Sequence, residues 1–163
     1  DSISECENVK GYQIFLKIGR KIKLPVRMFE TIARIIRYQN RMRSMIFYDQ
    51  ENSVFELRRL LITLKSDFDL SLLSAQAIQF AFTPDLDLDK KVSYFLNRID
   101  EQNSIDNWSQ FKLAVTGNEI MSLLDIVEGK RIGELISELT EQVVTGKINN
   151  SKEQCKSYLL NKL

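Results

Sequence analysis

The segment that decides the fold is residues 113–136, with the sequence LAVTGNEIMSLLDIVEGKRIGELI. Thr116 and Glu119 have the spacing of a capping box, in which each side chain satisfies a free backbone N–H of the other residue. We therefore expect a helix to begin at Gly117. Gly129 permits a tight turn, and apolar residues then recur every three or four positions, as on the buried face of an amphipathic helix. The segment predicts a helix, a turn and a second helix.

The residues that follow continue this helical pattern. Gly146 is placed to close the second helix in the left-handed conformation of a C-terminal cap. Asn150 and Glu153 have the spacing to start one more helix. Within the second helix, Gly133 lacks a side chain, so we expect a neighbouring backbone to approach closely there. The C-terminal part should be a compact helical subdomain.

The residues before this segment also predict helices, because the chain of 163 residues holds only 6 Gly and 2 Pro and its apolar residues recur at helical spacing. The expected helices are residues 8–23, 25–40, 53–64, 69–82 and 92–99. The fourth of these is apolar nearly all round, which is typical of a helix at the centre of a bundle. Asp69 or Ser71 can cap its start.

A polar, turn-rich segment at residues 100–107 is the predicted boundary between two parts of the chain. Trp108 and Phe111 should dock this connection onto a neighbouring part. The predicted fold class is therefore all-α, with a helical bundle body over residues 1–105 and a small helical tail subdomain over residues 106–163.

The composition argues against several classes of function. The chain has no histidine, which is the commonest general base near neutral pH and a usual zinc ligand. Cys6 and Cys155 stand in polar stretches without a partner at metal-binding spacing, so we expect reduced thiols and no metal site. No apolar run approaches the roughly 20 residues needed to cross a bilayer. We expect no membrane partner, and a cytoplasmic location, or an organellar matrix if the source is eukaryotic.

The alternating aspartates Asp85, Asp87 and Asp89 offer an alternative to this non-catalytic interpretation. On a strand they would point the same way and could hold two magnesium ions, as in a nucleotidyltransferase. We favour a structural role, because the run follows one predicted helix, leads into another and has no Gly-Ser turn just upstream. Acids that precede a helix interact favourably with its positive end.

The net charge of +1 conceals an uneven distribution. Residues 1–50 hold ten Lys/Arg against five Asp/Glu, residues 51–107 hold six against ten, and residues 108–163 hold seven against seven. One face of the helix expected after Pro25 carries four arginines within about a quarter of its circumference, namely Arg27, Arg34, Arg37 and Arg41. Solvated arginines are common on helix surfaces, but four without an accompanying acid favour binding to a polyanion.

Two expected helix starts could bind a phosphate, because each exposes unpaired N–H donors. The first lies at residues 116–118, and the second carries Lys130 and Arg131 just after Gly129. The alternative interpretation is a plain helical hairpin whose glycines serve only packing.

Three motifs in the predicted tail subdomain resemble the C-terminal tail of bacterial-type CCA-adding enzymes. They are residues 115–121 (VTGNEIM), 126–136 (IVEGKRIGELI) and 146–153 (GKINNSKE). They share one register across the tail, which makes them more specific than any single short motif. More loosely, residues 23–40 and 51–82 resemble the helical neck and body that precede this tail.

The resemblance implies the non-catalytic part of an enzyme that adds C, C and A to the 3′ end of tRNA. An N-terminal catalytic head would supply the chemistry with magnesium, CTP and ATP; this chain has no counterpart of that head, and the resemblance implies no cofactor or catalytic residue here. The helical part would hold the acceptor stem and the T arm of tRNA by shape. The residues expected to contact tRNA are Arg27, Arg34, Arg37, Arg41, Thr116, Gly117, Asn118, Lys130, Arg131 and Lys147.

The chain departs from the family pattern before the turn, where Asp125 replaces a glycine and Glu128 adds a second acid. Both acids weaken phosphate binding at this turn. Three other interpretations stay open: the C-terminal part of a bacterial poly(A) polymerase, an adaptor that binds a protein through its helical hairpin, and a non-specific DNA-binding protein. An adaptor should keep its partner at high salt, and a DNA-binding protein should bind duplex DNA as well as it binds tRNA.

Overall fold

The computed structural model describes residues 9–48, 53–84, 87–127 and 129–162. Every regular element within these ranges is a helix, which confirms the predicted all-α fold class. The helices gather into two compact units that divide between Gln110 and Phe111, whereas the sequence places the boundary after residue 105.

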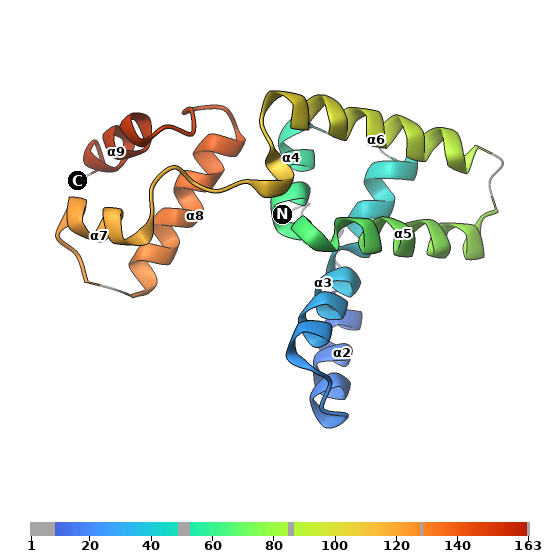
Figure 1. Ribbon diagram of the computed structural model, residues 1–163. Coiled ribbons are helices and arrows are strands. Elements are labelled where there is room, and N and C mark those ends of the chain that lie inside the picture. The colour runs from blue at the N-terminus through green and yellow to red at the C-terminus, as the bar shows by residue number, and fades with distance from the viewer. Residues whose placement is uncertain (1–8, 49–52, 85–86, 128, 163) are drawn as a thin grey trace. The chain divides into compact units, whose positions relative to one another are not determined.

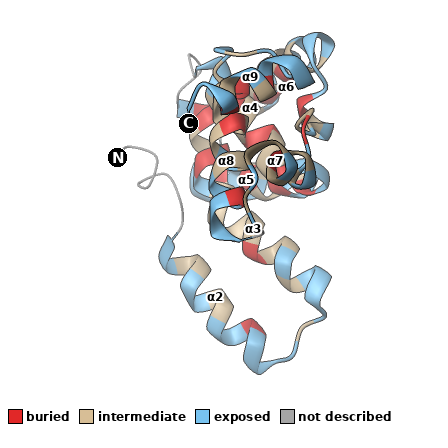
Figure 2. Cartoon of the chain, turned by 90° about the vertical axis from the view of Figure 1, so that its left-hand side faces the viewer, coloured by how far each residue is buried: buried red, intermediate tan, exposed pale blue. Residues whose placement is uncertain are grey.

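The first unit begins with a helical hairpin formed by α2 (Val9–Lys21) and α3 (Val26–Arg43) (Figure 1). Phe15 of α2 stacks on Phe29 of α3, with the ring centroids 5.3 Å apart. Gly19 permits this contact, because a Cβ atom there would lie 2.7 Å from the Phe29 ring. Gly19 is also the buried residue of α2, so most of this helix is open to solvent (Figure 2).

Three further helices form the body of this unit: α4 (Val54–Leu64), α5 (Phe68–Phe82) and α6 (Leu88–Ile105). A π-helical turn, Ser44–Tyr48, extends α3 towards them. Their inward-facing apolar side chains form the core, because apolar residues at three-to-four spacing place one stripe of each helix on the same side. The least exposed members are Met42, Ile46, Leu57, Leu60, Leu61, Leu64, Ala75 and Phe95.

The prediction that α5 lies at the centre of a bundle is wrong for the described residues. The helix buries Ser71, Ala75 and Gln79, while Leu73 and Phe80 remain 63% and 65% exposed. Small and polar side chains let α5 pack closely on α3, and their polar atoms find partners: Ser71 Oγ donates a hydrogen bond to a main-chain oxygen one turn back. Burial in this helix is therefore set by close packing rather than by hydrophobicity.

The ends of α5 and α6 also differ from the predictions. The helix α5 begins one residue before Asp69, so neither Asp69 nor Ser71 caps it. The helix α6 continues to Ile105 through most of the segment predicted as a turn-rich boundary. Gln102 in this last part accepts a hydrogen bond of 3.1 Å from the guanidinium of Arg58 in α4. This tertiary contact outweighs the local preference of polar residues for turns.

Trp108 closes the first unit. It begins a short 3-10 turn, Trp108–Gln110, and is 2% exposed. The Arg58 guanidinium lies over its ring, 4.7 Å from the ring centroid. The prediction that this tryptophan docks the connection onto a neighbouring part is confirmed.

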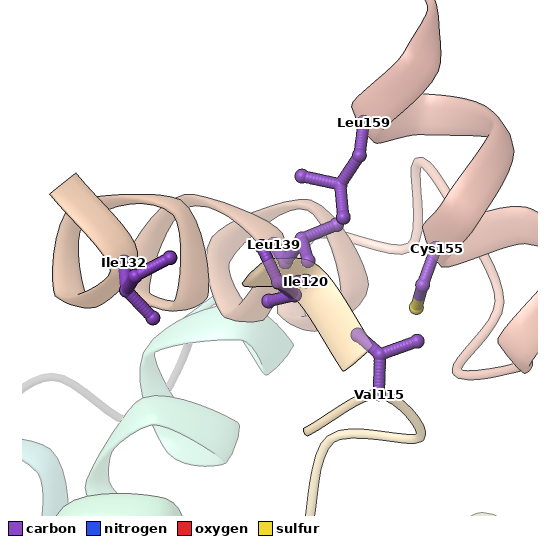
Figure 3. Packing of buried hydrophobic residues seen from close by; sticks show 6 residues of the cluster. All are labelled: Val115, Ile120, Ile132, Leu139, Cys155 and Leu159. Carbon is purple, nitrogen blue, oxygen red and sulfur yellow. The ribbon is translucent and has the colours of Figure 1, made fainter. Parts of the chain in front are cut away.

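The second unit contains α7 (Gly117–Leu124), α8 (Lys130–Val144) and α9 (Lys152–Leu160). Figure 3 shows its core, to which each helix and the segment before α7 contribute: Val115, Ile120, Ile132, Leu139, Cys155 and Leu159. Cys155, which stands in a polar stretch of sequence, is thus a core residue, and burial raises the pKa of its thiol. Cys6 lies outside the described residues.

The glycines of this unit have different roles. Gly146 follows α8 with φ +70°, which confirms the predicted left-handed C-terminal cap. The prediction for Gly133 is wrong, because a Cβ atom there would meet nothing within 4 Å. That position faces solvent on α8, so close packing within the unit does not require a glycine.

The start of α9 is one residue later than predicted. Ser151 is its N-cap, and its hydroxyl accepts a hydrogen bond from the backbone N–H of Gln154. Asn150 instead ties two distant segments together: its side chain accepts from the backbone N–H of Ala114 at 2.8 Å and donates to the backbone oxygen of Lys112 at 2.9 Å. Asn150 therefore fixes the entry into α7.

Candidate functional site

The four arginines predicted to form a ridge on α3 do not share one open face. Arg34 donates a hydrogen bond of 2.7 Å to Asp67, and the same carboxylate accepts one of 3.1 Å from Thr31. Arg41 pairs with Glu56 of α4, and only 11% of its side-chain surface is exposed. These contacts join α3 to the body of the first unit. Arg41 in particular is directed inward, whereas the prediction requires its side chain to lie at the surface.

The other two ridge arginines have different surroundings. The guanidinium of Arg37 lies over the rings of Tyr12 and Tyr38, 5.4 and 5.5 Å from their centroids. This arrangement links α2 to α3 by cation–π contacts. Arg27 lies at the hairpin end of α3 and is exposed. Its guanidinium is the one most accessible to a ligand.

The start of α7 is already occupied by a carboxylate of the chain itself. Thr116 and Glu119 form the predicted capping box, with hydrogen bonds of 3.3 Å and 2.8 Å. Lys152 of α9 donates a hydrogen bond of 2.7 Å to the same carboxylate. Together with the bonds from Thr116, it lowers the pKa of Glu119 to about 2. A permanent negative charge therefore competes with any phosphate at Gly117 and Asn118.

The cations predicted around α8 lie at its two ends. Lys130 and Arg131 are exposed in its first turn, where the ammonium group of Lys130 is 3.4 Å from the Glu134 carboxylate. Lys147 is exposed just beyond the other end. The helix has 15 residues, so its ends are about 22 Å apart at 1.5 Å per residue. One phosphate cannot contact both groups, and a ligand that contacts both must extend along the helix.

A pocket of about 210 Å³ opens beside α8 in the second unit. Lys162 and Tyr158 both donate hydrogen bonds to the Glu138 carboxylate and lower its pKa. Two cations and two acids line the pocket over a leucine floor: Arg131, Lys162, Glu134, Glu138, Leu124, Leu135 and Leu159. Because these charges balance, the pocket offers little attraction to a free anion.

Comparison with known proteins identifies the family. Residues 20–159 match the family model for tRNA nucleotidyltransferase domain 2. The chain belongs to this family. The matched range begins in the last turn of α2 and ends in the last turn of α9, so the tRNA nucleotidyltransferase domain extends over both compact units.

Part of the domain also resembles a curated enzyme. It is 38% identical over 47 residues to the CCA-adding enzyme of Enterococcus faecalis. These residues are 29% of this chain but 12% of that enzyme, so the likeness concerns a small part of the longer protein. No solved structure matches the chain.

The chain also carries a group of exposed cations, of which the sequence analysis selected only Arg27. They surround the turn between α2 and α3, and within residues 9–48 the sequence has one acid, Glu30. Within the described part of the chain, none of them forms an ion pair. We call them the hairpin cations, and they are Lys17, Arg20, Lys21, Lys23 and Arg27. The signal that could have found them is the run of basic residues at the end of a predicted helix.

The aspartates considered as magnesium ligands have a structural position. Asp87 stands at the N-cap of α6, and its carboxylate is 2.9 Å from the ammonium group of Lys90. Asp85 lies outside the described residues. Among the residues that are described, no group of three or more acids, cysteines or histidines is placed to hold a metal ion, and no helix is long and apolar enough to cross a membrane.

Proposed function

We propose that this domain is the non-catalytic, tRNA-binding C-terminal part of a CCA-adding tRNA nucleotidyltransferase. The observation that carries the proposal is the family match over residues 20–159. The likeness to the Enterococcus faecalis CCA-adding enzyme favours this branch over a poly(A) polymerase.

The domain would hold the acceptor stem and the T arm so that the 3′ end of the tRNA reaches an N-terminal catalytic head. A-form RNA has a deep, narrow major groove that side chains cannot read, which leaves phosphates and 2′-hydroxyls on a defined outline. A helical scaffold that presents exposed cations can recognise such an outline. Arg27, Lys130, Arg131 and Lys147 are exposed at separate places of this kind.

The ten residues predicted to contact tRNA do not contribute equally under this proposal. Arg34, Arg37 and Arg41 act mainly through their contacts with Asp67, tyrosine rings and Glu56, which set the position of α3. The Glu119 carboxylate weakens phosphate binding at residues 116–118. The main phosphate contacts are therefore assigned to Arg27, Lys130, Arg131 and Lys147.

The chemistry of nucleotide addition would belong to the head, which would use magnesium, CTP and ATP. This chain would contribute tRNA positioning only. Incubated alone with tRNA, CTP, ATP and magnesium, it should extend no tRNA end. Nucleotide addition by this chain alone would overturn its assignment as a non-catalytic part.

Competition binding tests the proposed ligand. The probe is a fluorescent tRNA transcript without its 3′ CCA, bound to the full chain at 0.1 M salt and followed by anisotropy. Unlabelled tRNA should displace it at least about tenfold better than an RNA hairpin or a DNA duplex of equal length, because only tRNA has the folded outline. Equal displacement by the DNA duplex, or no binding of the tRNA probe, would contradict the proposal.

A further inference from the structure

The hairpin cations form a concentrated positive surface at the junction of α2 and α3. All five are exposed, and Lys17 and Lys21 lie one helical turn apart on the outward side of α2. Arg20 and Lys21 occupy the last turn of α2, where cations interact favourably with the negative end of the helix. No acid of the described residues pairs with these side chains, so no ion pair in that part of the chain neutralises their charge. The exposed positive charges can therefore attract an anionic ligand.

Lys23 gives an independent reason to assign a function to this surface. Its φ of +53° lies in the left-handed region, and it occupies the position after α2 that usually holds glycine. The backbone N–H groups of Lys23 and Leu24 close the helix end by bonding to the oxygens of Arg20 and Gly19, both at 3.3 Å. A side chain in this conformation costs stability that glycine would not. The sequence nevertheless has lysine at this position, which places a cation at the tip of the hairpin.

Three apolar side chains on the same hairpin, Ile14, Ile18 and Ile22, are more than half exposed. A basic surface with apolar neighbours can bind RNA phosphates, an anionic lipid surface or an acidic protein. The family match favours RNA, so the choice rests on the proposed function. Phosphate binding requires the cations and not the isoleucines, which makes the alternatives separable.

We propose that the hairpin cations bind the phosphate backbone of the RNA substrate, as a contact surface separate from the cations of α8. Because one surface lies in each compact unit, the substrate would be held at two places. Lys17 and Lys21 each contact one phosphate, and Lys23 adds a third contact at the turn. The contacts carry no base specificity, since they involve only backbone oxygens.

The double variant Lys17→Gln/Lys21→Gln tests this surface, with the tRNA transcript without CCA as the probe. Each lost phosphate contact lowers the magnitude of the slope of log K against log salt by about 0.7 to 0.9. We expect a total decrease of about 1.4 to 1.8, which corresponds to a roughly 25- to 60-fold weaker affinity at 0.1 M salt. The matched control is Ser93→Glu/Asn97→Glu, which changes the net charge equally at exposed positions of α6. The control should retain the wild-type slope.

A single variant, Lys23→Gly, should change stability and binding in opposite directions. Removing the left-handed strain should raise the unfolding temperature by about 2–4 °C, while RNA affinity should fall about threefold or more with the loss of one contact. This outcome cannot be caused by partial unfolding. A higher unfolding temperature with unchanged affinity would overturn the role of Lys23.

Three results would overturn the wider proposal. One is an unchanged salt slope in Lys17→Gln/Lys21→Gln, and another is an equal decrease in the Ser93→Glu/Asn97→Glu control. The third is a loss of tRNA binding in Ile14→Ser/Ile18→Ser as large as that in the lysine variant, which would indicate apolar docking. A last outcome separates the two proposals. If the lysine variant binds tRNA and an equal-length RNA hairpin more weakly to the same extent, and the wild type prefers neither RNA, the hairpin cations still bind RNA but the proposed tRNA function fails.

Discussion

Replacing Arg41 with methionine separates a structural role of this residue from a role in RNA binding. Methionine keeps a long unbranched stem and removes the charge. Removing one member of a buried ion pair costs about 3–5 kcal/mol, because its partner is left unpaired. Here Glu56 is 27% exposed and keeps Arg59 at 2.5 Å, which reduces the expected cost to about 1–2 kcal/mol. The unfolding temperature of the first unit should fall by about 4–8 °C.

The single tryptophan of the chain makes this effect measurable. Trp108 is buried in the first unit, so its fluorescence during urea titration reports the unfolding of that unit. Arg27→Met is the matched control, because it makes the same replacement at an exposed position of the same helix. It should change stability by less than about 0.5 kcal/mol and weaken tRNA binding. Arg41→Met should instead lower stability and leave tRNA binding unchanged. Unchanged stability of Arg41→Met together with a loss of tRNA affinity would refute the inward orientation of Arg41.

Three further predictions concern the second unit. Leu139→Ala should cost about 2–5 kcal/mol, because Leu139 is fully buried in the core; circular dichroism during urea titration measures this, and a cost no larger than that of the half-exposed Leu160→Ala would contradict it. Gly133→Ala should stabilise the unit by about 0.5–1 kcal/mol, since a Cβ atom has free space on a solvent-facing helix position; a lower urea midpoint would show that another group needs that space. Glu119→Gln should keep the capping box but remove its charge. Because the hydrogen bonds from Lys152 and Thr116 lower the folded-state pKa of Glu119 to about 2 from 4.5, the stability that the charged Glu119 provides is complete above pH 4.5 and is lost as the pH falls towards 2. Wild type should therefore lose more stability than Glu119→Gln between pH 5 and pH 2, and parallel acid profiles would contradict this assignment.

The helices themselves were predictable from the sequence because their signals are local. The spacing of Thr116 and Glu119 predicts both the start of α7 and the two hydrogen bonds that cap it. Gly146 similarly predicts the end of α8. Tertiary contacts decided the cases where the predictions were wrong. Gln102 extends α6 through a polar segment by its bond to Arg58, and hydrophobic content alone could not show that α5 packs on α3 through its polar edge.

The candidate binding surface was less predictable, because the accessibility of a cation depends on acids that are distant in sequence. A helical wheel places Arg27, Arg34 and Arg41 on one side of α3 but contains no information about α4 and the turn that follows it. Those elements supply Glu56 and Asp67, which engage two of the three arginines. The composition of residues 1–50 correctly indicates an excess of positive charge, yet it cannot say which cations stay accessible.

Accessible and inward-directed cations of α2 and α3 have different physical consequences. A guanidinium such as that of Arg41 is held in one geometry and largely removed from water, so salt screens its interaction with Glu56 only weakly. The hairpin cations are exposed, and RNA phosphates that bind them must release counterions, which makes the interaction steeply dependent on salt. The same helix pair can therefore keep a stable position in the body and, under the proposal made above, offer a weak and reversible surface to RNA. Under the proposed function, a domain that holds tRNA and releases it after each extension would require both properties.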